Sequence, residues 1–195
     1  MSVAAATPPL AQVEHFRLSR ERYHQMIARG ILGEDERVEL IGGELVAMSP
    51  IGSEHSGVVD QLNEILVSQL ARRAVVKVQG PIHLNDYSEP EPDLVLSKQR
   101  KDYYKRSLPT PADILLVIEV ADSSLAYDRT VKMPLYARTG IPEAWIVNLI
   151  DRWIEVHRDP SPAGYTTMLK LLPGRTIAPQ AFADVIVAVD ALLSE

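Results

Sequence analysis

Two acidic residues stand at the ends of apolar stretches, where a carboxylate is unusual. Glu119 is the penultimate residue of Ile114–Val120, which is otherwise apolar. An unpaired charge in such a buried strand is strongly destabilising. Glu119 therefore either has a function or lies at a sheet margin, where water or an arginine neutralises it. Asp93 follows Pro92 and begins a second apolar stretch. Taken alone, Asp93 is more simply interpreted as a turn residue that accepts backbone hydrogen bonds.

Together the two carboxylates suggest a metal site. If the strand that begins at Asp93 runs antiparallel to Ile114–Val120, Asp93 lies beside Glu119 across the pair. Two carboxylates a few ångströms apart repel one another unless a proton or a divalent cation lies between them. Oxygen ligands from carboxylates and water suit Mg²⁺ or Mn²⁺. The pattern therefore predicts such a cation at the end of Ile114–Val120, the position at which open α/β sheets bind ligands.

A lysine follows these acids on the next predicted helix, Asp128–Thr139. The crossover brings the first half of that helix back over the strand end. There the ammonium group of Lys132 stabilises charge that develops on a reacting phosphate, or helps to activate a water. By spacing alone, an exposed ion pair between Lys132 and Asp128 is the simpler interpretation.

A basic segment and one histidine are candidates for contact with a nucleic acid. The segment from Lys98 to Arg106 contains five basic residues, one acid and two tyrosines, which fits contact with a phosphate backbone, although most such segments are solvated loops. His55 lies in the first turn of a predicted helix, where it binds a phosphate or a water, or satisfies local backbone groups. The candidate nucleic-acid-binding residues are His55, Lys98, Arg100, Lys101, Lys105 and Arg106.

The periodicity of apolar residues predicts the elements that position these groups. A helix is expected from Ser19 to Arg29, and a hairpin turns at Gly42-Gly43 with Glu39 opposite Val46. Strand, helix and strand in succession predict a parallel, right-handed crossover. The further expected elements are a helix from Ser53, its capping residue, to about Leu70, strands at Val75–Gln79, Glu91–Leu96, Ile114–Val120 and Glu143–Asn148, an antiparallel pair of Trp153–Arg158 with Tyr165–Leu171, and a last strand at Val185–Val189.

Composition narrows the class of protein. The chain has 195 residues, 46% of them hydrophobic, and a net charge of -6, which is ordinary for one globular domain and unusual for a nucleic-acid coat protein. It contains no cysteine, which excludes disulfides, zinc–cysteine sites and cysteine nucleophiles. Its apolar runs are shorter than the ~20 residues of a membrane span. We expect a disordered tail at residues 1–13, one domain at residues 14–195, and a cytoplasmic location.

The order of these motifs resembles that of the Uma-two family of bacterial endonucleases. The resemblance runs through Val38–Val46, His55, Glu89–Leu94, Val117–Val120, Asp128, Lys132, Tyr136, Gly140 and Glu143–Val147. It implies a restriction-endonuclease-like domain of the PD-(D/E)XK superfamily. That fold is of the α/β (α+β) class, with a mixed sheet flanked by helices, and here it would carry an N-terminal helix and hairpin.

The resemblance also implies roles for individual residues. In this superfamily an Asp and a Glu hold one or two Mg²⁺ ions, which carries over to Asp93 and Glu119. The usual lysine two residues after the second acid is absent, because Ala121 occupies that position, and Lys132 resembles a migrated lysine. For a further acid from an N-terminal element we choose Glu39.

The resulting prediction is an endonuclease that hydrolyses DNA with Mg²⁺ or Mn²⁺. Its catalytic residues are Asp93, Glu119, Lys132 and Glu39, of which the three acids are the metal ligands. Two alternatives stay open: a non-catalytic relative that binds nucleic acid or protein, and a hydrolase for another phosphoester. The missing Glu-x-Lys spacing and the acidic net charge favour the first of these. By analogy, a homodimer paired through the C-terminal strands is possible.

Overall fold

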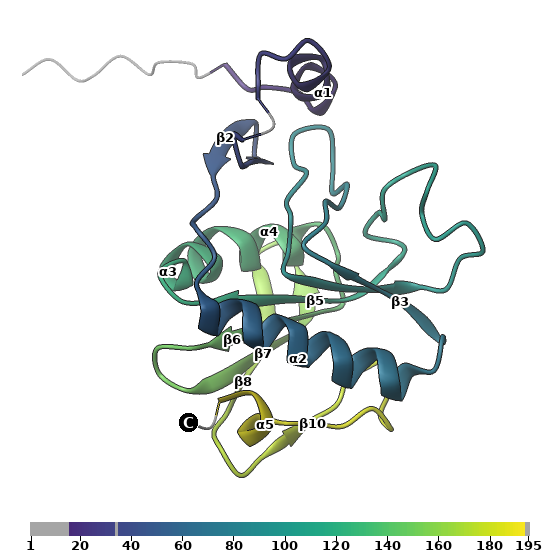
Figure 1. Cartoon of the computed structure of the whole chain (residues 1–195), viewed down its shortest axis with the longest axis vertical. Coiled ribbons are helices and arrows are strands. Elements are labelled where there is room, and N and C mark those ends of the chain that lie inside the picture. Colours follow the sequence, from purple (N-terminus) through teal and green to yellow (C-terminus); the bar gives the residue numbers. More distant parts are fainter. Residues whose placement is uncertain (1–15, 34, 194–195) are drawn as a thin grey trace, which may run out of the picture.

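The computed structural model describes residues 16–33 and 35–193, so the predicted tail at residues 1–13 lies outside the described residues. A six-stranded sheet in the order β3-β4-β5-β6-β7-β8 forms the centre (Figure 1). Only β5 and β6 are parallel, and the other neighbouring strands are antiparallel, which confirms the predicted mixed sheet and the parallel pairing of the two crossover strands. The strands are β3 (Ala74–Val78), β4 (Leu94–Lys98), β5 (Ile114–Ala121), β6 (Glu143–Asn148), β7 (Trp153–Ser161) and β8 (Gly164–Leu171).

Helices cover both faces of the sheet. Successive side chains of β5 point to opposite sides, so its apolar residues contribute to a core on each face. On one face Ile118 packs in a core with Leu62 and Leu66 of α2 (Ser53–Leu70). On the other face Val117 packs with Tyr136 of α4 (Met133–Arg138). Strand β5 is therefore buried on both sides, as its continuous apolar sequence predicts. The first core is completed by β9 (Thr176–Ile177), β10 (Val187–Ala188) and α5 (Val189–Leu193). The last strand, β10, is shorter than the strand predicted at Val185–Val189.

The helical segment after β5 differs from the single helix expected at Asp128–Thr139. It starts earlier and consists of α3 (Leu125–Tyr127), the π-helical turn η1 (Asp128–Lys132) and α4 (Met133–Arg138). Pro134 has no N–H, and in a regular α-helix its ring clashes with the carbonyl four residues earlier. The wider turn, in which Met133 donates to the carbonyl of Asp128, accommodates that ring. Both Asp128 and Lys132 are buried at this turn.

An N-terminal unit lies above one end of the sheet (Figure 1). It comprises the predicted first helix, α1 (Arg20–Ala28), which Ser19 caps, and the hairpin of β1 (Val38–Ile41) and β2 (Glu44–Ala47). The register pairs Glu39 with Val46, which confirms the predicted hairpin. Leu40 bridges to Glu89, whose buried carboxylate binds Arg20 of α1. These contacts fasten the hairpin, and with it Glu39, over the sheet.

Other expected elements also differ in detail from the structure. The strand expected at Glu91–Leu96 is displaced toward the C-terminus, since β4 runs from Leu94 to Lys98. Gly52, rather than Ser53, is the residue that precedes the first turn of α2, and it provides no side-chain cap. Among the helices of residues 16–33 and 35–193, none has the combined length and hydropathy that a bilayer crossing requires.

Candidate active site

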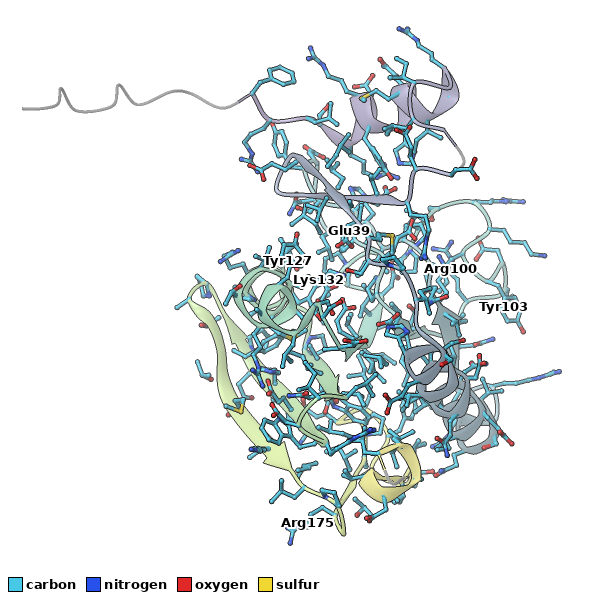
Figure 2. All side chains as sticks on the ribbon, turned by 60° about the vertical axis from the view of Figure 1, so that its left-hand side comes forward. Glu39, Arg100, Tyr103, Tyr127, Lys132 and Arg175 are labelled. Atoms are coloured by element: carbon cyan, nitrogen blue, oxygen red, sulfur yellow. The ribbon has the colours of Figure 1, made fainter. Side chains whose placement is uncertain are left out.

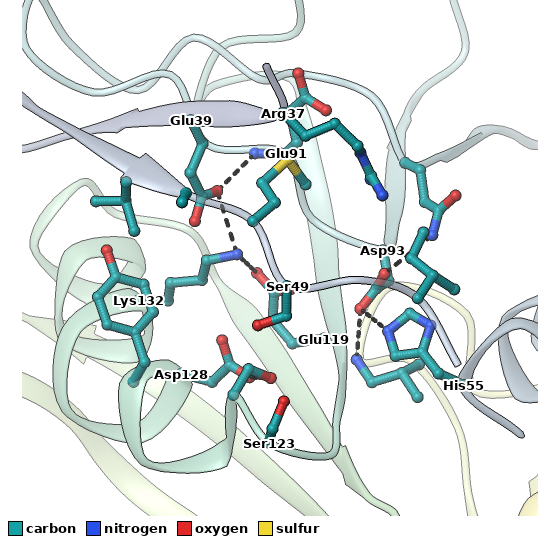
Figure 3. A pocket seen from close by; sticks show the side chains of 18 residues that line it. Arg37, Glu39, Ser49, His55, Glu91, Asp93, Glu119, Ser123, Asp128 and Lys132 are labelled. Atoms are coloured by element: carbon teal, nitrogen blue, oxygen red, sulfur yellow. Dashed lines mark hydrogen bonds and ion pairs between the residues drawn. The ribbon is translucent and has the colours of Figure 1, made fainter. Parts of the chain in front are cut away.

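A cavity of about 320 Å³ opens at the carboxyl end of β5 (Figure 3). The hairpin, the start of α2 and the helical segment of residues 125–138 form its walls. The structure thus brings together five residues that the sequence proposed for chemistry, although they come from five separate elements or loops. These residues are Glu39, His55, Asp93, Glu119 and Lys132.

Asp93 lies beside Glu119, as the predicted antiparallel pairing requires. Leu94 is paired with Ile118, so the residue before β4 reaches the level of Glu119 in the neighbouring strand. The Oδ2 atom of Asp93 accepts the backbone N–H of Val120 at 2.8 Å. Asp93 does accept a backbone hydrogen bond, as its interpretation as a turn residue expects, but the donor belongs to the neighbouring strand β5.

His55 contacts the same carboxylate. Its Nε2 lies 3.2 Å from Oδ2 of Asp93, while its Nδ1 is buried without a hydrogen-bond partner among the described residues. The hydrogen bond with Asp93 raises the pKa of His55 above its ordinary value, against the effect of burial. His55 thus joins the start of α2 to the start of β4, and the interpretation that it satisfies local backbone groups is wrong.

Glu119 is 3% exposed and has two donors on one oxygen. The hydroxyl of Tyr136 donates to Oε1 at 2.5 Å, and Nζ of Lys132 lies 3.4 Å from the same atom. Burial raises the pKa of Glu119 well above its ordinary value, and the ammonium of Lys132 opposes that shift. Within the described part of the chain, Oε2 accepts no hydrogen bond. Glu119 is therefore neither solvated nor paired with an arginine.

Lys132 joins the hairpin to the sheet. Its Nζ lies 3.2 Å from Oε2 of Glu39, an atom that also accepts the backbone N–H of Glu91 at 3.1 Å. Burial lowers the pKa of Lys132, but the surrounding carboxylates outweigh it and raise the pKa above its ordinary value. The ammonium therefore stays charged although the residue is only 7% exposed. Its ion pairs join it to Glu39 and Glu119 rather than to Asp128, so the simpler interpretation from spacing is wrong.

Three further residues of the site were not assigned from the sequence. Asp128 lines the cavity, and burial raises its pKa to about 6. Tyr136 holds Glu119, and Arg37 brings a cationic side chain to the wall. The sequence did contain a signal that could have assigned Asp128 to the site, because this residue lies one helical turn before Lys132. The sequence offered no comparable signal for Arg37.

The basic segment Lys98–Arg106 is not part of this cavity. It begins at the far end of β4 from Asp93, about 16 Å along the strand at ~3.3 Å per residue. Figure 2 shows Arg100 and Tyr103 to one side of Glu39 and Lys132. Arg100 is engaged locally, by Asp102 and by the ring of Tyr104. A nucleic-acid contact by this segment therefore stays a prediction.

The carboxylates fit a divalent cation as a pair. The carboxylates of Asp93 and Glu119 carry the hard oxygen donors that divalent cations prefer, and the pairing of Leu94 with Ile118 places the two residues opposite each other. Oε2 of Glu119 is not engaged by a neighbour in the described structure. Across residues 16–33 and 35–193, however, no three His, Asp or Glu side chains are spaced to hold a metal ion together. Lys132 stands between Glu39 and Glu119 instead. Metal binding by Glu39 stays a prediction.

Comparison with known proteins places this site in a family. The Uma2 family, described as "Putative restriction endonuclease", matches residues 20–190, which is most of the chain. The chain belongs to the Uma2 family. The match confirms the resemblance seen in the motifs, and it includes every residue of the site described above. A search of curated proteins finds no match to this Uma2 chain.

One solved structure shows the same fold. A crystal structure from Anabaena variabilis, described as a putative nuclease belonging to DUF820, superposes with a TM-score of 0.73. The sequences are 15% identical, and the match covers 91% of this Uma2 chain and 98% of the other. The predicted fold, a mixed sheet flanked by helices as in restriction-endonuclease-like nucleases, is confirmed.

Proposed function

We propose that this Uma2 protein is an endonuclease that hydrolyses phosphodiester bonds of DNA with Mg²⁺ or Mn²⁺. One observation carries the proposal: a buried, charged lysine and the carboxylates of Asp93 and Glu119 converge on one cavity at the end of β5. The family supplies the nuclease class. The choice of DNA and of the cation is our proposal, supported by the oxygen-only ligand pair.

The two carboxylates and the groups that contact them have separate roles in this mechanism. Asp93 and Glu119 would hold the cation, and a bound cation would supply Lewis-acid chemistry by lowering the pKa of a water and polarising the scissile phosphate. His55 and the N–H of Val120 orient Asp93 through Oδ2, and the Tyr136 hydroxyl orients Glu119 through Oε1.

Lys132 supplies charge stabilisation in this scheme. Its ammonium is held in place by two carboxylates before substrate arrives, so little reorganisation is needed when negative charge develops on the phosphate. The same contacts keep it protonated, so Lys132 acts as a fixed positive charge and does not take a proton from the attacking water.

A cleavage assay on plasmid DNA with Mg²⁺ or Mn²⁺ tests the proposal. Removing one ligand charge without changing side-chain shape, by Asp93→Asn or Glu119→Gln, is expected to lower the rate at least ~100-fold. Glu143→Gln is the matched control, because Glu143 is also a buried carboxylate of the sheet but pairs with Arg158 outside the cavity. Its activity per folded molecule should equal that of the wild type. Equal cleavage by all four proteins would identify the activity as contamination.

The absence of a three-residue ligand group from the described chain favours one alternative, a non-catalytic relative that binds nucleic acid or protein. Calorimetric titration with Mn²⁺ separates the two, because such a relative gives no heat that depends on Asp93. Assays with RNA and small phosphodiesters beside DNA test for a different phosphoester substrate.

Assembly and location are separate parts of the proposal. A homodimer would pair through β8, the C-terminal of the two edge strands of the sheet, on which Met168 and Leu169 are exposed. Sedimentation of the purified protein tests this pairing. The cytoplasmic location stays a prediction.

A further inference from the structure

One ammonium group faces several carboxylates in the cavity. Glu39, Asp93, Glu119 and Asp128 line it together with Lys132, whose Nζ lies 3.2 Å from Glu39 and 3.4 Å from Glu119. The carboxylates of Glu39 and Glu119 thus share one counter-ion. The nearest positive charge to both is part of the protein itself.

Lys132 engages one carboxylate oxygen of Glu119 and one of Glu39. Lys132 uses Oε1 of Glu119, together with Tyr136, and leaves Oε2 without a hydrogen bond in the described structure. It also uses Oε2 of Glu39, which a backbone N–H engages as well. A divalent cation bound by Asp93 and Glu119 therefore shares the Glu119 carboxylate with an ammonium group. Two positive charges on one buried carboxylate repel each other strongly, because the surroundings screen them poorly.

We propose that Lys132 is a built-in counter-ion that weakens the affinity of this cavity for divalent cations and keeps Glu39 out of the ligand set. The inference rests on the proposed function, because it takes Asp93 and Glu119 as the metal ligands. Replacing Lys132 by a neutral side chain of similar length then tightens cation binding while it removes the charge used in catalysis. Affinity and activity move in opposite directions. A lysine that merely holds Glu119 in place has the opposite effect on affinity.

Calorimetric titration with Mn²⁺ alone measures the affinity. The Kd of Lys132→Met is expected to be lower than that of the wild type by at least about tenfold. Lys77→Met is the matched control, because Lys77 is also partly buried but donates to the carbonyl of Pro81 and does not line the cavity. Its Kd should stay within a factor of about two of the wild type, since an unrelated lysine leaves the ligands unchanged.

Loss of the counter-ion also affects folding, which provides a second measurement. In Lys132→Met two buried carboxylates face each other without compensation, so the metal-free protein melts at a lower temperature. Mn²⁺ should then raise the melting temperature of this variant more than that of the wild type at the same concentration. The double variant Lys132→Met/Glu39→Gln removes one of the two charges and folds more readily. Its Kd should lie between those of Lys132→Met and the wild type.

The outcomes separate this inference from the proposed function. If the wild type binds Mn²⁺ and Asp93→Asn does not, but neither Lys132 variant binds more tightly than the wild type, the counter-ion inference is overturned and the metal site stands. If the wild type gives no heat that depends on Asp93, the metal site fails, and the inference fails with it. Tighter binding by both Lys132 variants, with Lys77→Met unchanged, supports it.

Discussion

Tyr136→Phe tests how the fold holds the buried carboxylate of Glu119. The hydroxyl is removed, but the ring remains in a position that is fully buried against the sheet. The lost bond is 2.5 Å long and ends on a charged acceptor, and such bonds contribute ~1.5–3 kcal/mol. For a chain of this length each kcal/mol lowers the melting temperature by ~2–4 °C. A loss of about 2 kcal/mol therefore predicts a melting temperature ~4–8 °C lower at a pH at which Glu119 is ionised.

Calorimetric melts of four proteins measure this contribution. A double-mutant cycle of wild type, Tyr136→Phe, Glu119→Gln and the double variant isolates the interaction between the two side chains. Tyr165→Phe is a matched control, because its hydroxyl donates to the neutral backbone carbonyl of Ile141 at 2.9 Å and should contribute only about 1 kcal/mol. The reasoning is refuted if Tyr136→Phe melts within about 1 °C of the wild type, or if it costs as much in the Glu119→Gln background.

Two further predictions concern stability. The first concerns Glu155. Burial raises the pKa of this carboxyl, but hydrogen-bond donors that include the Arg129 guanidinium outweigh burial and hold the pKa well below its ordinary value of 4.5. Its contribution is therefore complete above about pH 5 and lost as the pH falls further, so urea unfolding of the wild type and Glu155→Gln should differ most at neutral pH and converge in acid. Gly43→Ala should lower stability by ~1–3 kcal/mol, since φ is +91° and the added Cβ would lie 2.7 Å from that of Arg17. Gly42→Ala, at φ +61° with no atom within 4 Å, should cost less, and an equal loss contradicts the steric argument.

Local pattern was sufficient to predict the elements around the site. The Gly42-Gly43 pair sets a two-residue turn, so the register that pairs Glu39 with Val46 follows from the sequence. The continuous apolar stretch of β5 can be buried only between two layers, which made Glu119 conspicuous. The adjacency of Asp93 and Glu119 followed once an antiparallel pairing was assumed.

The partners of the charged groups were not predictable in this way. Spacing along the helix favoured Asp128 as the ion-pair partner of Lys132. In the structure Lys132 instead forms ion pairs with Glu39 of the hairpin and Glu119 of β5. His55 likewise contacts Asp93 rather than its own turn.

The sequence by itself therefore determined which residues form strands and helices. It also showed that Glu119, a carboxylate in the central strand β5, needs a partner for its charge. The tertiary structure alone decided which cation neutralises that acid, because the position of the hairpin over the end of β5 depends on contacts between distant segments. It also decided that the basic segment lies away from the cavity, because a strand separates the two along its whole length. Periodicity records which face of an element is buried, but not which other element covers it.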